Sequence, residues 1–343
     1  MEGTEMDADH AAAPVTLLRM MTGHWVAKAL NVAAELGVAD LLRDGPLTSS
    51  ELATACRAHP PTLYRLLRAL ASVGVFAEVE GRRFELTPLA QLLRSDDPDS
   101  MRALVRMYVA SEQYSAWADL LDSVRTGEPA FPKRYGTSAW EYRSTRPDVD
   151  AVFNEAMTRW TTEVADAVVA AYDFAGINKV VDVGGGHGLL LATILRAHPE
   201  MHGVLLDLPR VIAGAQPLLE AAGVAERCEA VGQNFFESVS DGGDACILAQ
   251  ILHDWDDARC GVILSNCRRA MHPQGKLLVI EQLLPPGNEP SFGKWLDLHM
   301  HVMLGGRERT KAEYGALLGA SGFELVNVIP TRSAASIVEG FCV

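Results

Sequence analysis

The stretch "VVDVGGGHG", residues 180–188, decides the fold, because a short apolar strand runs directly into a glycine-rich turn. The chain beyond it alternates between helical patterns and short apolar runs. Four of these runs predict further strands: "GVLLDL" (203–208), "CEAVGQ" (228–233), "DACILAQ" (244–250) and "KLLVIEQLL" (276–284). Strands that alternate with helices over about 150 residues indicate a parallel, doubly wound sheet. We therefore predict an α/β, Rossmann-like domain whose ligands bind at the carboxyl ends of the strands.

The first hundred residues carry a different, mainly helical pattern. Thr48 followed by Glu51 is a capping box that begins a short helix, and "HPPTLYRLLRALASVGVF" (59–76) supplies another. The stretch "FAEVEGRRFEL" (76–86) alternates around a Glu-Gly pair, which indicates a hairpin. We predict an all-helical winged-helix dimerisation domain over residues 1–100, with this hairpin as its only strand signal, and a second domain over residues 101–343.

Winged helices often bind DNA, so a DNA-binding regulator is an alternative for this N-terminal domain. Against it, Arg65 and Arg68 lie within a strongly apolar helix, and the net charge of the chain is −14. Phosphate contacts need clustered cations, so dimerisation is the better interpretation. We expect neither a nucleic-acid partner nor a membrane.

The sequence indicates a cytoplasmic protein. The stretch "MEGTEMDADHAAAP" (1–14) lacks the basic start and apolar core of a signal peptide, and we interpret it as a short disordered lead-in. No run reaches the roughly 18 apolar residues that a membrane-spanning helix needs. The six cysteines are scattered without a C-x-x-C pair, so we expect reduced thiols.

The glycine turn favours S-adenosylmethionine over a dinucleotide as the cofactor. From Asp182 the pattern is D-x-G-x-G-x-G, whose glycines are Gly184, Gly186 and Gly188. A dinucleotide fingerprint requires G-x-G-x-x-G, and its third position here is leucine. S-adenosylmethionine has no pyrophosphate to seat on the helix, but its amino-acid tail needs an open turn. The second strand ends in Asp207, which can accept both ribose hydroxyls, and Asn234 and Phe235 follow the third strand where adenine would lie.

His253 closes the fourth strand in "AQILHDWDD" (249–257), and it could be a catalytic base, part of a metal site or a neighbour of a helix cap. The acids at 254, 256 and 257 lack a spacing that converges on one ion, and His299 and His301 point apart on a helix, so we expect no metal. Asp254 or Asp256 can cap the next helix. Glu281 ends the fifth strand and Glu308 lies in "GGRERT" (305–310); a carboxylate beside an imidazole fixes its tautomer and stabilises its protonated form.

Four motifs together carry a family resemblance: D-V-G-G-G-x-G, D-L-P after the second strand, H-D-W-x-D and G-G-R-E-R-T. Over residues 15–343 the chain resembles the plant caffeic-acid and bacterial natural-product O-methyltransferases. The resemblance implies a seven-stranded methyltransferase domain, a homodimer, and His253 as general base flanked by Glu281 and Glu308. We include Asp254 in this catalytic set. It also implies that Asp207 binds ribose, and we add Leu208, Gln250 and Thr161 to the predicted cofactor residues.

Two positions depart from the family's usual pattern. The chain has Gln233-Asn234-Phe235-Phe236 where G-D-F-F or similar is usual, so Asn234 keeps an acceptor for the adenine amine but has lost the charge. Gln250, three residues before the base, replaces an arginine that is common in bacterial members. Neither change removes a predicted chemical role.

The predicted reaction moves the methyl group of S-adenosylmethionine to a hydroxyl, expected to be phenolic, of a small aromatic acceptor, and leaves S-adenosylhomocysteine. An adaptable apolar pocket suits such an acceptor. Its candidate residues are Met107, Phe153, Met157, Trp160, His299, Met300 and Met303. Two alternatives of similar fold are an N-methyltransferase, which needs no histidine base, and a cofactor-binding homologue with altered chemistry such as hydroxylation.

Overall fold

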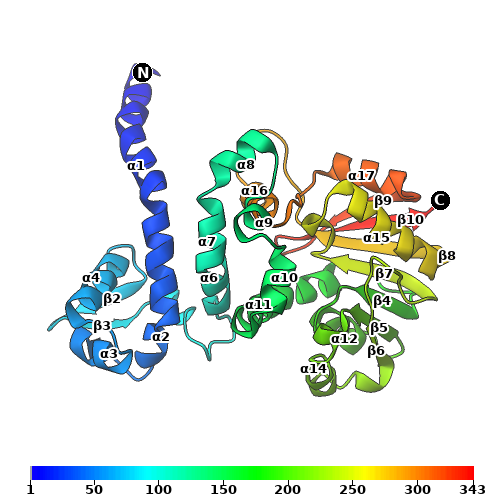
Figure 1. The fold of residues 1–343 in the computed structure, drawn as a ribbon, viewed down its shortest axis with the longest axis horizontal. Coiled ribbons are helices and arrows are strands. Elements are labelled where there is room, and N and C mark those ends of the chain that lie inside the picture. The colour runs from blue at the N-terminus through cyan, green and yellow to red at the C-terminus, as the bar shows by residue number, and fades with distance from the viewer. Residues whose placement is uncertain (1) are drawn as a thin grey trace. The chain divides into compact units, whose positions relative to one another are not determined.

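The glycine turn follows an interior strand of a seven-stranded sheet, whose strands run in the order β6-β5-β4-β7-β8-β10-β9 (Figure 1). The strands from β4 to β8 are parallel, whereas β10 is antiparallel to both β8 and β9. The five predicted strands are therefore confirmed, and the sheet gains a C-terminal antiparallel pair. The seven strands are β4 (Lys179–Val183), β5 (His202–Asp207), β6 (Cys228–Gly232), β7 (Gly243–Ala249), β8 (Met271–Glu281), β9 (Phe323–Pro330) and β10 (Ser336–Cys342).

Helices cover both faces of this sheet, because successive strand residues point to opposite sides. In β8, Leu277 and Val279 pack with α15 and α17, whereas Leu278 and Ile280 pack with α11 and α12. All four of these side chains are fully buried. The covering elements are α11 (Pro147–Ala171), α12 (Leu189–Ala197), α13 (Pro209–Ile212), α14 (Gln216–Ala221), η1 (Ala225–Arg227), α15 (Asp257–Ala270) and α17 (Lys311–Ala320).

This computed structural model describes the backbone of residues 2–343 and the side chains from residue 13 onward. The chain divides into two compact units. One takes the chain as far as Tyr114 together with Asp148–Arg159, and the other holds Ser115–Pro147 and Trp160–Val343. The domain boundary that the sequence places at residue 100 remains a prediction.

The first unit has its own core, built from short helices and a three-stranded sheet of order β1-β3-β2. The capping box is confirmed: Thr48 accepts from the amide of Glu51, whose carboxylate accepts from the amide of Thr48. The predicted hairpin is also present as β2 and β3, so the unit is not helical throughout. Its elements are α1 (Glu2–Glu35), α2 (Val38–Leu41), β1 (Leu47–Thr48), α3 (Ser49–Ala55), α4 (Pro60–Ala71), β2 (Phe76–Val79), β3 (Arg83–Leu86), α5 (Pro88–Gln91) and α6 (Arg102–Tyr108).

The long helix α1 differs from its predicted form at its start. Helical backbone begins at Glu2, so the expected disordered lead-in is wrong for the described residues 2–14, while Met1 lies outside them. Farther along, Met20, Met21 and Trp25 each expose more than 60% of their surface in the single chain. No described helix is both long and apolar enough to cross a membrane.

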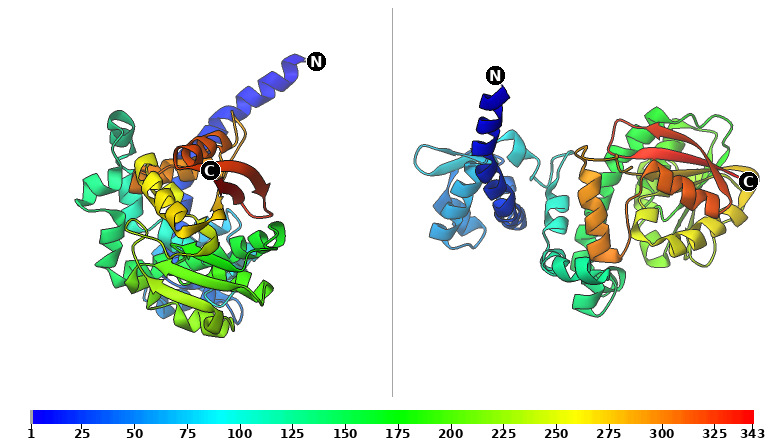
Figure 2. Two further views of the ribbon diagram at one scale, coloured as in Figure 1. Left: turned by 90° about the vertical axis from the view of Figure 1, so that its right-hand side faces the viewer. Right: turned by 90° about the horizontal axis from the view of Figure 1, so that it is seen from above.

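The second unit also contains a group of short helices that precedes the sheet in the chain and packs on α16. Val302 and Met303 of α16 share a small core with Ala130 and Phe131 of α9. Figure 2 shows orange α16 beside these teal helices. The short helices are α8 (Leu120–Thr126), α9 (Ala130–Tyr135) and α10 (Ala139–Ser144), preceded by α7 (Ser111–Trp117), which begins in the first unit; α16 (Phe292–Leu304) follows β8 in the chain.

Candidate active site

The predicted site residues of the sheet follow strands that end on one edge. The amide of Gly184, after β4, donates to the carbonyl of Leu206 in β5 at 2.7 Å. The amide of Gln250, after β7, donates to the carbonyl of Ile280 in β8 at 3.0 Å. Parallel neighbours place their carboxyl ends together, so the residues that follow these strands converge.

The glycine turn needs its glycines for two physical reasons. Gly184, Gly186 and Gly188 have φ of 75°, 60° and 86°, which residues with a side chain rarely adopt. A Cβ on Gly184 would also lie 2.5 Å from Ile251 Cδ1, and one on Gly188 would lie 2.8 Å from Leu205 Cδ2. A Cβ on Gly186 would meet nothing within 4 Å, and residues 184–187 are only partly buried, so the backbone at the centre of the turn is open to a ligand.

Two carboxylates border this turn. Asp207 Oδ2 accepts from the amide of Gly186 at 2.9 Å, and its Oδ1 accepts from the amide of Leu208 at 2.6 Å. Asp182 is almost fully buried, and neither of its oxygens has a hydrogen-bond partner among the described residues. Burial raises the pKa of Asp182 to about 7. An orphaned buried acid beside an open glycine turn fits a ligand with an ammonium group and a ribose, as S-adenosylmethionine has.

The other predicted cofactor residues occupy varied positions. The Phe235 ring lies beside the turn, since a Cβ on Gly184 would be 3.4 Å from Phe235 Cε1. Asn234 uses its Oδ1 to accept from the amide of Phe236 at 3.1 Å, so that oxygen is partly engaged in a local turn. Thr161 lies on α11 in the second unit and is half-buried.

His253 sits in a buried one-turn helix, η2 (Leu252–Asp254), between β7 and α15. The carboxylate of Glu281 organises the amide side of this turn. Its Oε1 lies 3.0 Å from the amides of Ile251 and Leu252 and 3.4 Å from that of His253. Asp256, not Asp254, caps α15 by accepting from the amide of Arg259 at 2.8 Å.

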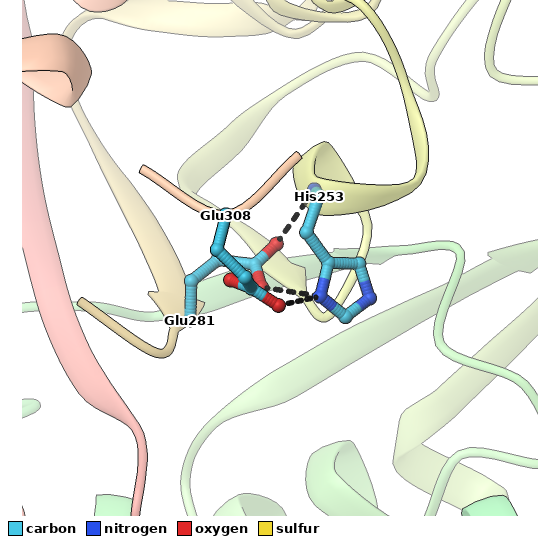
Figure 3. A group of neighbouring side chains, drawn as sticks. All are labelled: His253, Glu281 and Glu308. Carbon is cyan, nitrogen blue, oxygen red and sulfur yellow. Dashed lines mark hydrogen bonds and ion pairs between the residues drawn. The ribbon is translucent and has the colours of Figure 1, made fainter. Parts of the chain in front are cut away.

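Three carboxylates surround the imidazole of His253. Figure 3 shows two of them, those of Glu281 and Glu308. Its Nδ1 lies 2.7 Å from Glu308 Oε1 and 3.4 Å from Glu281 Oε2. Its Nε2 lies 3.4 Å from Asp254 Oδ1. Because a carboxylate only accepts, Nδ1 carries a hydrogen in either protonation state, and Nε2 is the atom that can gain or lose a proton.

The charges of this cluster favour the protonated imidazole. Burial alone would lower the pKa of His253, but the three carboxylates outweigh it and raise that pKa to about 10. Burial raises the pKa of Glu281 too and raises that of Asp254 to about 6. The imidazole of His253 and the carboxylates beside it therefore compete for the same proton, and the cluster titrates as a unit.

Besides Glu308, three other residues of the "GGRERT" loop lie against the turn that carries His253. The amide of Arg307 donates to the carbonyl of His253 at 2.9 Å. Gly306 passes so close to the same turn that a Cβ on it would lie 2.0 Å from His253 O. Arg309 is fully buried against the turn. Our sequence reasoning assigned no role to Gly306 or Arg309; the buried loop motif "GGRERT" was the only available signal.

Gln250, a predicted cofactor residue, also has a contact near His253. Its backbone has φ of 57°, an unusual value for a residue other than glycine. Its side-chain amide donates to Glu281 Oε2 at 3.2 Å. Gln250 therefore contacts one of the three carboxylates around His253, and its part in cofactor binding remains a prediction.

Three residues of the site have a geometry that could hold a metal ion. One ligand atom from each of His253, Glu281 and Glu308 lies within 4.8 Å of the others. Residue spacing does not reveal this combination, because its three members lie in separate parts of the chain. That no metal takes part remains a prediction.

The predicted acceptor residues fall in both units. Met107, Phe153 and Met157 form one apolar cluster in the first unit. In the second unit, Trp160 packs against the sheet core and Met303 is a core residue of α16. His299 is buried there and its Nδ1 accepts from the indole N–H of Trp117 at 2.9 Å, while burial lowers its pKa to about 4. Met300, its neighbour, is also buried.

The sheet, the open glycine turn and the acid that ends the next strand define a Rossmann-like, S-adenosylmethionine-dependent methyltransferase. Residues 117–324 match the O-methyltransferase domain, and residues 18–96 match the O-methyltransferase dimerisation domain. The chain therefore belongs to the O-methyltransferase family, and S-adenosylmethionine is its cofactor. The winged-helix description of the dimerisation domain remains a prediction.

Individual relatives agree with this assignment. The phenazine O-methyltransferase of Lysobacter antibioticus is 54% identical over 323 residues, which cover 94% of each chain. The solved structure of a mitomycin 7-O-methyltransferase is 40% identical with a TM-score of 0.92, covering 98% of this chain and all of that one. A neocarzinostatin-biosynthesis O-methyltransferase, solved with S-adenosylmethionine and 2-hydroxy-5-methyl naphthoic acid, is 36% identical with a TM-score of 0.83, covering 92% and 96%.

Proposed function

We propose that this enzyme methylates a phenolic hydroxyl of an aromatic natural product and that His253 is the general base. One observation carries the proposal: Nδ1 of His253 is held by Glu308 at 2.7 Å in a buried site. In the neutral imidazole this contact leaves the lone pair on Nε2. That atom can then take the acceptor's proton as the oxygen attacks, which is typically worth ~10²–10⁴-fold in rate.

The carboxylates have distinct parts in this proposal. Glu308 fixes the tautomer, and together with Glu281 it stabilises the imidazolium that forms. Glu281 also holds the backbone of the turn. Asp254, 3.4 Å from Nε2, lies where it can orient the incoming hydroxyl.

The cofactor supplies a methyl group activated by a sulfonium. The proposed residues around it are the open turn at 184–188, Asp207 for the ribose hydroxyls and Asp182 for the ammonium group. Leu208, Asn234, Phe235, Gln250 and Thr161 complete the proposed set. These residues hold the cofactor and take no part in the proton transfer, which is proposed for His253.

The acceptor is proposed to be a flat, hydroxylated ring system. Supporting this, relatives are named for phenazine, mitomycin and naphthoic-acid substrates. A hydroxyphenazine is the first compound to test, since the phenazine enzyme shares 54% identity with this chain. The proposed pocket residues are Met107, Phe153, Met157, Trp160, His299, Met300 and Met303.

The working form is proposed to be a homodimer in the cytoplasm. Residues 18–96 match a dimerisation domain, and α1 exposes Met20, Met21 and Trp25. An isologous twofold interface is the commonest way to cover such a surface. All six cysteines are free thiols, as a reducing compartment requires. Sedimentation at micromolar concentration tests the dimer, and a monomer there would contradict it.

The function is tested with His253→Ala against hydroxyphenazine and aminophenazine. We expect the wild type to methylate the hydroxyl, and the variant to bind S-adenosylhomocysteine normally but lose ~10²–10⁴-fold in kcat. His272→Ala removes an exposed histidine and serves as the control. Methylation of the amine alone would favour an N-methyltransferase, and a variant with more than half the wild-type rate would exclude His253 as the base.

A further inference from the structure

The turn that carries His253 has backbone groups that need partners on both of its sides. Glu281 satisfies the amide side through a single carboxylate oxygen. A short 3₁₀ turn cannot satisfy its own last carbonyls, and a buried carbonyl without a donor is costly. The carbonyl side of η2 therefore needs donors from elsewhere in the fold.

Arg309 supplies the charged donors to two of these carbonyls. Its Nη1 donates to the carbonyl of Leu252 at 2.9 Å, and its Nη2 donates to that of Trp255 at 3.0 Å. The carbonyl of Leu252 also accepts from the amide of Trp255 at 3.3 Å and from the weakly donating thiol of Cys260. The two carbonyls stand on either side of His253. The guanidinium is thus the counterpart of the Glu281 carboxylate, and the turn is held between them.

The guanidinium is itself fixed in position. Asp257 Oδ1 accepts from Nε at 3.1 Å and from Nη2 at 2.7 Å. The backbone carbonyl of Arg309 accepts from the amide of Leu284 at 3.1 Å, just beyond β8. The Arg309 side chain is 1% exposed. A planar group with five N–H donors suits several fixed acceptors, whereas a lysine ammonium could not span the same set.

The neighbouring arginine shows that this burial is specific to position 309. Arg307 leaves 42% of its side chain exposed and pairs with Glu313. Glu308 stands between the two arginines and reaches Nδ1 of His253. One loop therefore provides both the carboxylate that fixes the imidazole ring and the guanidinium that fixes the backbone beneath it.

We propose that Arg309 is a positioning residue for methyl transfer: its guanidinium holds the carbonyls of Leu252 and Trp255 and so keeps His253 aligned with Glu308 and the acceptor. The proposal rests on the proposed role of His253 as general base. Arg309 touches no reacting atom, and it acts only through the histidine.

The proposal predicts a specific kinetic pattern. Without the guanidinium, the base keeps its chemistry but can leave its working position, and a misplacement of about 1 Å can cost on the order of 10²-fold. We expect Arg309→Gln to lose kcat by about that factor, while KM and the Kd of S-adenosylhomocysteine stay within about twofold. Arg309→Lys reaches one carbonyl and should lose about tenfold.

A double-mutant cycle separates positioning from general damage to the fold. In the His253→Ala background there is no base to align, so adding Arg309→Gln should change the residual rate by less than about twofold. An equal loss in both backgrounds would overturn the proposal. So would an Arg309→Gln variant that keeps more than half of the wild-type kcat. Lys311→Gln, two residues on and exposed, removes the same charge and serves as the control.

If Arg309→Gln fails to fold, Asp257→Ala takes its place in the same cycle, because Asp257 is 60% exposed and its loss loosens the guanidinium without leaving a void. We expect about a threefold loss of kcat with His253 present and no loss without it. A loss of equal size in both backgrounds would again contradict the proposal. Failure of the proposed function looks different, since His253→Ala alone would then be active.

Discussion

Gly306 makes the alignment of the base sensitive to one methyl group. A Cβ at this position would lie 2.0 Å from the carbonyl oxygen of His253 and 2.5 Å from the carbonyl carbon of Asp254. Ordinary contact begins at 3.4 Å, so Gly306→Ala falls about 1.4 Å short of the room it needs. Both neighbours are backbone, and no flexible side chain can turn away to make that room.

To make room for the Cβ that Gly306→Ala adds, either the loop that carries Glu308 or the turn that carries His253 must move away from the other. Both movements lengthen the 2.7 Å contact between His253 Nδ1 and Glu308 Oε1. We expect kcat to fall on the order of 10²-fold, because about 1 Å of misplacement has that cost. The glycine turn and Asp207 follow other strands, so the Kd of S-adenosylhomocysteine should be unchanged. Steady-state kinetics with a hydroxyphenazine and calorimetry with S-adenosylhomocysteine measure the two quantities.

The matched control for this variant is Gly261→Ala. A Cβ at Gly261 meets nothing within 4 Å, and the residue lies inside α15. We expect unchanged kcat and a stability gain of roughly 0.5–1 kcal/mol, since alanine is the better helix former. A Gly306→Ala enzyme with more than half of the wild-type kcat would refute the reasoning, because the loop would then yield without moving the base.

Three further predictions concern the cofactor, the pH profile and metals. S-adenosylhomocysteine should bind the wild type in the micromolar range, and NAD should not bind; calorimetry that shows the reverse preference would contradict the cofactor assignment. Asp207→Ala should weaken the binding of S-adenosylhomocysteine by about tenfold or more while the fold stays intact. Because the pKa of His253 is raised to about 10 and the base must be deprotonated to act, kcat/KM should rise with pH from 7 towards 10. Glu308→Gln removes one carboxylate that favours the imidazolium, so its inflection should move to lower pH; an unmoved inflection would exclude that coupling. Prolonged treatment with EDTA should leave the rate unchanged, and a loss restored by a divalent cation would assign the site at His253, Glu281 and Glu308 to a metal.

The parallel half of the sheet could be predicted because its strands are nearly continuous apolar runs followed by glycine or acidic residues. The strands β9 and β10 were implied only by the family resemblance. The sequence of β9, "FELVNVIP", mixes exposed and buried positions, and that of β10, "SIVEGFC", interrupts its apolar run with Glu339 and Gly340. β9 is an edge strand with one partner, so it buries less of itself and its pattern is correspondingly weaker. The helical start of α1 was also missed, because its acidic composition resembles that of a disordered tail.

The residue types of the site, and the placement of Glu281 and Glu308 beside His253, could be predicted, but the other contacts could not. His253, Glu281 and Glu308 stood out because each follows a strand or lies in a short charged motif. The contact of Gln250 with Glu281 depends on a backbone φ of 57°, which no spacing indicates. The partner of His299 is Trp117, 182 positions away in the chain. Such pairings arise from tertiary packing, which local patterns do not encode.

The order of the strands divides the proposed roles between two halves of one sheet. The glycine turn and Phe235 follow β4 and β6, and Asp207 ends β5, whereas His253 follows β7 and Glu281 ends β8. The halves meet where Gly184 packs against Ile251. A lineage can therefore exchange the residues of one half, and with them the atom that is methylated, while the other half continues to hold the same donor. The site for the methyl donor can thus be kept in evolution while the residues that select the methylated atom change.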